Sequence, residues 1–132
     1  MRRAVEAWWR AACEDRDMAH LAANSDHLAP AAFHCQQAAE KALKALLVLH
    51  HVEAREHSLV ELFDYVQTQS LIQPPPPVLT AARRLDPHYI QARYPGPRGP
   101  APEDLYDGVI TKELIECAGE ILSWVEPLLA SP

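Results

Sequence analysis

The chain has 132 residues, of which 48% are hydrophobic, and this length suits one compact domain over residues 1–132 that folds without metal or disulfide staples. Its formal charge of −6 at pH 7 argues against indiscriminate binding to nucleic acid, which needs a concentrated positive surface. No stretch approaches the roughly 20 apolar residues of a membrane-spanning helix and none resembles a signal peptide, so we expect a soluble cytoplasmic protein with no membrane contact.

The first two predicted elements are long helices. The first runs from about Arg3 to Ala23, and the cap-favouring residues 24–26 end it. Pro30 suits the first turn of the second helix, which is predicted to run to about His51. Its apolar stripe occupies positions 32, 35, 39, 42, 46 and 49, and a row of polar residues falls outside the stripe: Gln36, Gln37, Glu40, Lys41 and Lys44.

The middle of the chain predicts two shorter helices. Ser58-Leu59-Val60-Glu61 matches a capping box and begins a third helix, which ends before the proline run at 74–77 because proline cannot continue it. Residues 78–85 predict a fourth, short helix. Asp86 can cap a further turn that Pro87 restarts.

A loop and a long helix complete the chain. The stretch 95–102 is rich in proline and glycine and predicts an irregular, partly stiff loop whose conformation the sequence leaves open. Apolar positions at steps of three and four predict a last helix from about Asp107 to Glu126. No alternating strand pattern occurs. The expected fold class is therefore all-α, an up-and-down bundle of four main helices plus one short helix.

Arg83 and His88, with four residues between them, form the arrangement that suggests catalysis. An arginine offers a positive fork for phosphate, and histidine, with an ordinary pKa of about 6.5, can move a proton at neutral pH. Together they suit metal-independent RNA cleavage, in which a 2′-hydroxyl attacks the neighbouring phosphate. The alternative is a solvated helix arginine and a polar turn histidine, and Pro87 between them leaves their relative orientation open.

Four further residues are candidates for binding a nucleotide or RNA. Arg93 can grip a phosphate, Tyr94 can stack on a base, and Arg98 lies at the centre of the proline loop. The alternative assigns Arg93 to closing a helix end and Tyr94 to packing under the loop. Lys41 belongs to the polar row of the second helix, which is either a solvated face or a row that positions Arg93 or a dimer contact.

No metal and no other cofactor is predicted. Three cysteines lie far apart without the paired spacing of zinc sites, and we expect them to be small buried thiols: Cys13, Cys35 and Cys117. His50, His51 and His57 offer no pair at helical i, i+4 spacing. His57 is instead expected to set the start of the third helix.

Three blocks of the sequence carry a resemblance to a known family. They are Gln36-Gln37-Ala38-Ala39-Glu40-Lys41-Ala42-Leu43-Lys44, then His57-Ser58-Leu59, and then Leu85-Asp86-Pro87-His88-Tyr89-Ile90-Gln91-Ala92-Arg93-Tyr94-Pro95. In this order and spacing they resemble the HEPN domain family of prokaryotes. The likeness runs from about Ala4 to about Leu128, nearly the whole chain.

The resemblance implies a helical homodimer that binds RNA or a nucleotide. Many HEPN domains are metal-independent ribonucleases, often toxins, whose arginine and histidine meet their symmetry mates across a dimer groove. The matching residues here would be Arg83 and His88, although Arg84 and Pro87 depart from the catalytic pattern. The branch that this chain resembles is often encoded beside a small nucleotidyltransferase, which implies such a partner protein. The alternative is a non-catalytic nucleotide-binding or protein-interaction bundle.

Overall fold

The structure is a computed structural model that describes residues 2–130, and all the regular structure within them is helical. In chain order the elements are α1 (Arg2–Asn24), α2 (Leu28–Leu49), α3 (Leu59–Gln69), α4 (Pro76–Leu85), α5 (His88–Gln91), the 3₁₀ turn η1 (Pro102–Leu105) and α6 (Gly108–Leu129). The predicted all-α bundle is confirmed, and the helix boundaries fall within about one turn of the predicted ones.

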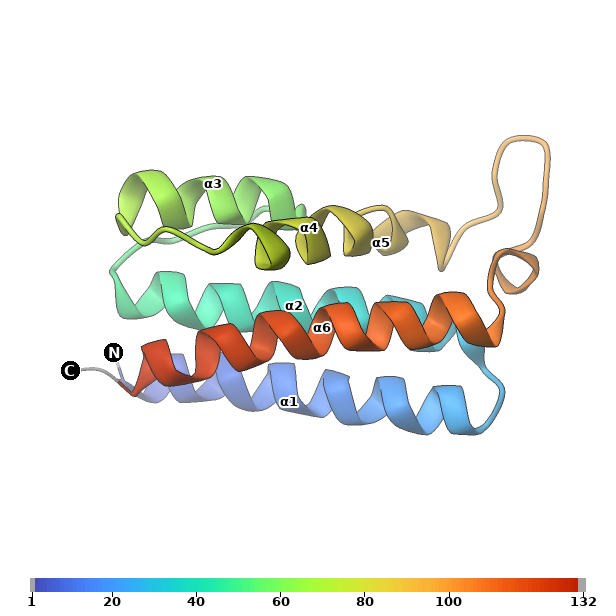
Figure 1. The fold of residues 1–132 in the computed structure, drawn as a ribbon, viewed down its shortest axis with the longest axis horizontal. Coiled ribbons are helices and arrows are strands. Elements are labelled where there is room, and N and C mark those ends of the chain that lie inside the picture. Colours follow the sequence, from blue (N-terminus) through green and yellow to red (C-terminus); the bar gives the residue numbers. More distant parts are fainter. Residues whose placement is uncertain (1, 131–132) are drawn as a thin grey trace.

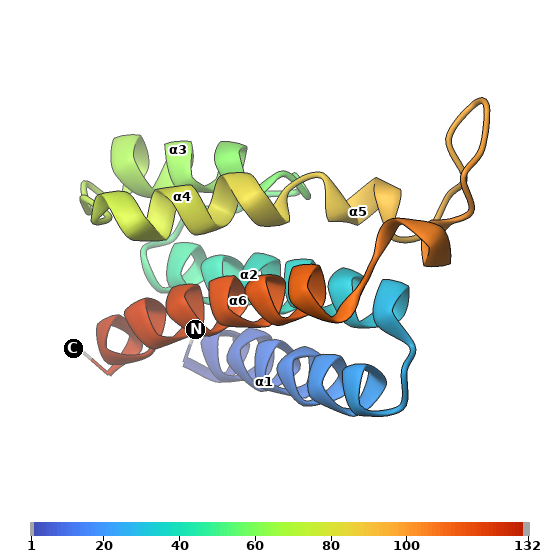
Figure 2. The same ribbon diagram turned by 45° about the vertical axis from the view of Figure 1, so that its right-hand side comes forward.

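The helices form an up-and-down arrangement around α2. Figure 1 shows α1, α2 and α6 lying alongside one another, with α3, α4 and α5 in a further layer over α2 and α6, on the side away from α1. Arg2 donates a hydrogen bond to the carbonyl of Leu129 at 2.8 Å, which joins the start of α1 to the end of α6. The loop that precedes η1 projects from the opposite end of the bundle (Figures 1 and 2).

The core follows the predicted apolar stripe of α2. The side chains at positions 32, 35, 39, 42 and 46 are fully buried and that of Leu49 is partly buried, because α1 and α6 pack against this face. Of the three cysteines, Cys35 and Cys117 are buried as expected, whereas Cys13 is partly exposed. Burial raises the pKa of the Cys35 thiol to about 12, which keeps it protonated and unreactive at neutral pH.

The polar row of α2 is also largely buried. Gln36 is completely inaccessible, Glu40 is 3% exposed and Lys44 is 7% exposed. They are covered because α3 and the segment before it pack on the side of α2 that lies away from the apolar stripe. These three residues therefore do not form a solvated face.

Asp86 does not cap the turn that follows it, and this prediction was wrong. Its carboxylate accepts hydrogen bonds from the backbone N–H groups of Leu59 and Val60 and from the Ser58 hydroxyl, all at the start of α3. The free N–H groups of a helix N-terminus attract a carboxylate, and the end of α4 lies beside the start of α3. Ser58 also accepts from the backbone N–H of Glu61, as the capping box predicts.

The last helix starts as predicted and ends one turn later. Asp107 is its N-cap, and its side chain accepts from the backbone N–H of Ile110 at 2.8 Å. The helix continues through Pro127 to Leu129. No helix within residues 2–130 combines the length and the apolar character that crossing a membrane requires.

Candidate functional site

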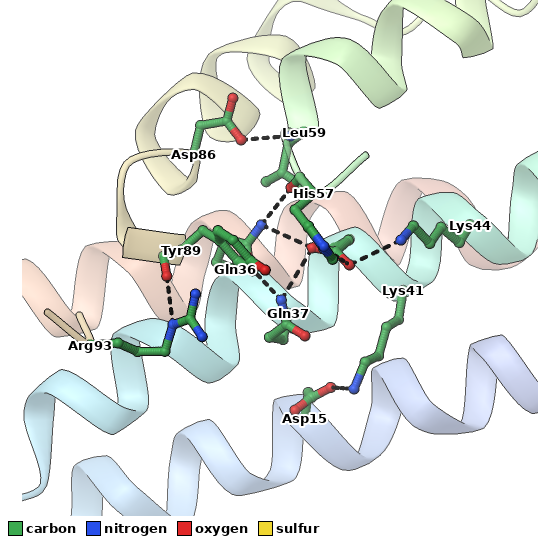
Figure 3. A network of polar contacts seen from close by, with 11 residues as sticks. Asp15, Gln36, Gln37, Lys41, Lys44, His57, Leu59, Asp86, Tyr89 and Arg93 are labelled. Atoms are coloured by element: carbon green, nitrogen blue, oxygen red, sulfur yellow. Dashed lines mark hydrogen bonds and ion pairs between the residues drawn. The ribbon is translucent and has the colours of Figure 1, made fainter. Parts of the chain in front are cut away.

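Glu40 is the centre of a buried hydrogen-bond network on α2 (Figure 3). Its carboxylate lies 3.2 Å from the Lys44 ammonium, 3.1 Å from the Gln37 amide nitrogen and 3.1 Å from His57 Nδ1. A carboxylate that is removed from water needs this number of donors, because each unsatisfied lone pair would destabilise the fold. The network therefore fixes the position of every side chain that reaches Glu40.

The network ties the segment before α3 to α2. Gln36 donates from its side-chain amide to the backbone carbonyl of His57 at 2.9 Å, while Glu40 holds the ring of the same residue. His57 is thus held through both its backbone and its side chain, although its imidazole remains half exposed. A residue held in this way at a surface is preorganised for contact with a ligand.

Tyr89 of α5 joins this network to Arg93. The His57 ring stacks on the Tyr89 ring with centroids 4.6 Å apart and an interplanar angle of 12°. On the same tyrosine, the Arg93 guanidinium carbon lies 4.4 Å from the ring centroid, and Arg93 Nε donates to the Tyr89 carbonyl at 2.8 Å. Figure 3 shows these side chains gathered between α2 and α5.

The Arg93 guanidinium is packed among three aromatic rings. It lies 4.7 Å from the centroid of Phe33 and 5.1 Å from that of Tyr94, in addition to Tyr89. Cation–π contacts of this kind hold the guanidinium in place without neutralising its charge. Within residues 2–130 no carboxylate pairs with Arg93, and the residue is exposed, so its two terminal nitrogens are available to an anion.

Lys41, another predicted binding residue, has its charge matched by a carboxylate. Its ammonium lies 2.6 Å from Asp15 of α1, a residue that is 7% exposed and that also contacts His34 at 2.7 Å. The lysine therefore joins α1 to α2, and its charge is already matched. Arg93, in contrast, keeps an unmatched charge.

Arg83 and His88 form no hydrogen bond with each other in the described chain, and their neighbours differ. His88 is half buried, and its Nδ1 shares a hydrogen bond of 2.6 Å with the hydroxyl of Tyr106. Burial lowers the pKa of His88, partly opposed by a hydrogen bond with the backbone of Arg84, and burial raises the pKa of Tyr106 to about 12. Arg83 is exposed on the α3 side of α4, where it lines a shallow hollow of about 210 Å³.

Tyr94 and Arg98 are the two remaining predicted binding residues. Tyr94 is 55% exposed and follows Arg93 directly, so its ring is open to a ligand. Arg98 is exposed in the projecting loop and forms no ion pair with an acidic residue of the described chain. The structure therefore groups Arg93, Tyr94 and the α2 network, whereas Arg83 and His88 face other surroundings.

A family model for the HEPN domain matches residues 5–128 of the chain. The chain belongs to the HEPN domain family. No curated protein matches it. Among solved structures, a protein of Thermus thermophilus is 32% identical with a TM-score of 0.87, over 96% of this chain and 98% of that one.

Two further solved structures carry the HEPN name. An archaeal HEPN homologue is 36% identical with a TM-score of 0.79, over 95% of this chain and 97% of the homologue. A HEPN domain protein from Thermotoga maritima is 24% identical with a TM-score of 0.77, over 96% and 99% of the two chains, and at this identity it supports the fold alone. The resemblance inferred from the three sequence blocks is thus confirmed.

Several members of this candidate site were not predicted from the sequence. Phe33 and Tyr89 were not predicted to hold Arg93, and His57 was expected only to set the start of α3. One signal was available, because Gln36, Glu40 and Lys44 recur at steps of four and so form a polar stripe along α2. Such a stripe in a helix that is otherwise apolar indicates polar contacts with a neighbouring element.

Proposed function

We propose that this HEPN domain binds the phosphate of a nucleotide or of RNA through Arg93, as a non-catalytic binding module. Tyr94, with its ring exposed beside Arg93, stacks on a base, and Arg98 in the projecting loop adds positive charge. Lys41 contributes to the site by holding α2 against α1, since its ammonium is paired with Asp15.

This proposal rests on the terminal nitrogens of Arg93, which are available to donate hydrogen bonds to a ligand. Its Nε is used by the Tyr89 carbonyl, and its plane is packed against Phe33 and Tyr89, so the side chain loses little further freedom when a ligand binds. The terminal nitrogens remain without an acidic partner in the described chain. A fixed guanidinium with free donors matches the paired oxygens of a phosphate group.

Titration of the purified protein with ATP, GTP and a short single-stranded RNA tests the proposal. We expect saturable binding of at least one ligand and a loss of about tenfold or more in affinity for Arg93→Ala, because a hydrogen-bonded charge contact is worth about 1.5–3 kcal/mol. Arg3→Ala is the matched control: Arg3 is also exposed and forms no ion pair with the described residues, but it lies in α1. Equal weakening by both substitutions, or no binding by the wild type, would contradict a site at Arg93.

A metal-independent ribonuclease is the second candidate, and the environment of His88 favours it. Burial lowers the pKa of His88, so its imidazole is neutral at pH 7 and able to accept a proton. Because Arg83 and His88 have different neighbours in the described chain, this candidate requires a homodimer in which a second copy completes the groove. RNA cleavage in EDTA that His88→Ala abolishes would support it, and intact RNA at high protein concentration would reject it.

A small nucleotidyltransferase is the partner that the family resemblance implies, and we keep this pairing as part of the proposal. Co-expression with a nucleotidyltransferase encoded beside this chain, followed by size-exclusion chromatography, tests it. Co-elution is the expected result, and separate elution of two intact proteins would contradict the pairing.

A further inference from the structure

His57 presents one ring nitrogen to a buried carboxylate and the other to solvent. Its Nδ1 lies 3.1 Å from Glu40, whose other contacts are the Lys44 ammonium and side-chain amide groups. An ionised carboxylate only accepts hydrogen bonds, so His57 Nδ1 carries the hydrogen. In the neutral ring, Nε2 is then an acceptor.

This acceptor is fixed and has no protein donor. Nε2 forms no hydrogen bond within residues 2–130, and the side chain is 51% exposed. The ring cannot turn freely, because Gln36 holds the His57 carbonyl, Glu40 holds Nδ1 and Tyr89 stacks on one face. An acceptor held open to solvent in this way selects a ligand that brings a hydrogen-bond donor.

The acceptor and the phosphate-binding group proposed above belong to side chains that contact the same aromatic ring. The His57 ring and the Arg93 guanidinium carbon lie 4.6 Å and 4.4 Å from the centroid of the same Tyr89 ring. Arg93 favours an anionic group on the ligand, whereas His57 favours a hydrogen-bond donor on the ligand. A ribonucleotide carries both groups close together, as a phosphate and the 2′-hydroxyl of the adjacent ribose, and a deoxyribonucleotide lacks the hydroxyl.

We propose that His57 Nε2 accepts a hydrogen bond from a ribose 2′-hydroxyl, so that this surface prefers RNA to DNA. The inference rests on the proposed binding at Arg93 and adds the class of nucleic acid. His34 is also paired with a carboxylate, at 2.7 Å from Asp15, but it is 27% exposed and packs edge-on against Phe33 instead of stacking on Tyr89. His57 is therefore the imidazole positioned to accept a hydrogen bond from the sugar.

Fluorescence anisotropy with three single-stranded oligonucleotides of one sequence tests the contact. The three are RNA, DNA and RNA with 2′-fluoro sugars, which keep a weak acceptor but cannot donate. The wild type is expected to bind RNA roughly three- to tenfold more tightly than either of the others, the range of one net hydrogen bond. His57→Phe keeps a ring against Tyr89 and removes Nε2, so it should bind all three equally, at the level of DNA.

The control is His50→Phe, which changes an exposed imidazole at the end of α2 and should keep the preference for RNA. Should His57→Phe fail to fold, His57→Leu replaces it, because leucine also lacks an acceptor, and the wild-type ratio stands as a separate test. Equal binding of the three ligands by the wild type, or an unchanged ratio in the folded His57 variant, would overturn the sugar contact and leave Arg93 binding intact. If the wild type binds none of them, the sugar contact is overturned, and the titrations with ATP and GTP decide separately whether Arg93 binds a nucleotide.

Discussion

Two buried carboxylates decide which cations around α2 remain available to a ligand. Asp15 pairs with Lys41 at 2.6 Å, and Glu40 pairs with Lys44 at 3.2 Å, so both lysines of the polar row have a matched charge. Arg93 has aromatic neighbours instead, and these do not cancel its charge. The selectivity of the surface for an anion is therefore expected to come from this one guanidinium.

His88 should make the stability of the protein sensitive to acid. Burial lowers the pKa of its imidazole from the ordinary value of 6.5 in the folded state. Below that value the unfolded chain binds a proton more readily than the folded one, so the free energy of unfolding falls as the pH drops through about 6.5. Above it, both states are neutral at this position and no effect remains.

Urea unfolding at pH 8, 7, 6 and 5.5 checks this expectation. In His88→Asn the free energy of unfolding should fall less below pH 6.5 than it does in the wild type. The difference in stability between wild type and variant should therefore shrink as the pH is lowered. A constant difference at all four values would show that His88 does not titrate differently in the two states.

At the level of secondary structure, Asp86 joins the end of α4 to the start of α3, 26 to 28 residues earlier in the sequence. It follows α4, yet its carboxylate accepts from two backbone N–H groups and one hydroxyl at the start of α3. The same contact fixes the position at which His57 enters α3, because Ser58 is the next residue. The cap of α3 therefore also supports the geometry of the Glu40 network.

Asp86→Ala should destabilise the protein by about 2 kcal/mol, the upper range for loss of a helix N-cap, because it leaves the α3 donors without their acceptor. The free energy of unfolding in urea measures this. Asp64→Ala is the matched control, since Asp64 is exposed in α3 and its side chain pairs with no described residue. Equal effects of the two substitutions would refute the capping role.

For the whole molecule, periodicity predicted the helices and the apolar face of α2 but not the contacts between distant segments. The stripe through Cys35 and Leu46 is read from spacing alone, because burial against a neighbour follows the helical repeat. The stacking of His57 on Tyr89 depends on how α5 packs against α2. Spacing along the chain also paired Arg83 with His88, whereas the bend at Pro87 gives them separate surroundings.

Phosphate binding at Arg93 can be tested by titrating the ¹⁵N-labelled protein with a short single-stranded RNA and following the titration by NMR. Because Arg93 Nε donates to the Tyr89 carbonyl, its side-chain N–H can be followed as a resolved signal. Phosphate binding at Arg93 should cause saturable shifts of this signal and of the backbone amides around Tyr89 and Tyr94. Shifts confined to the surroundings of Arg83 and His88, with the Arg93 signal unmoved, would contradict it.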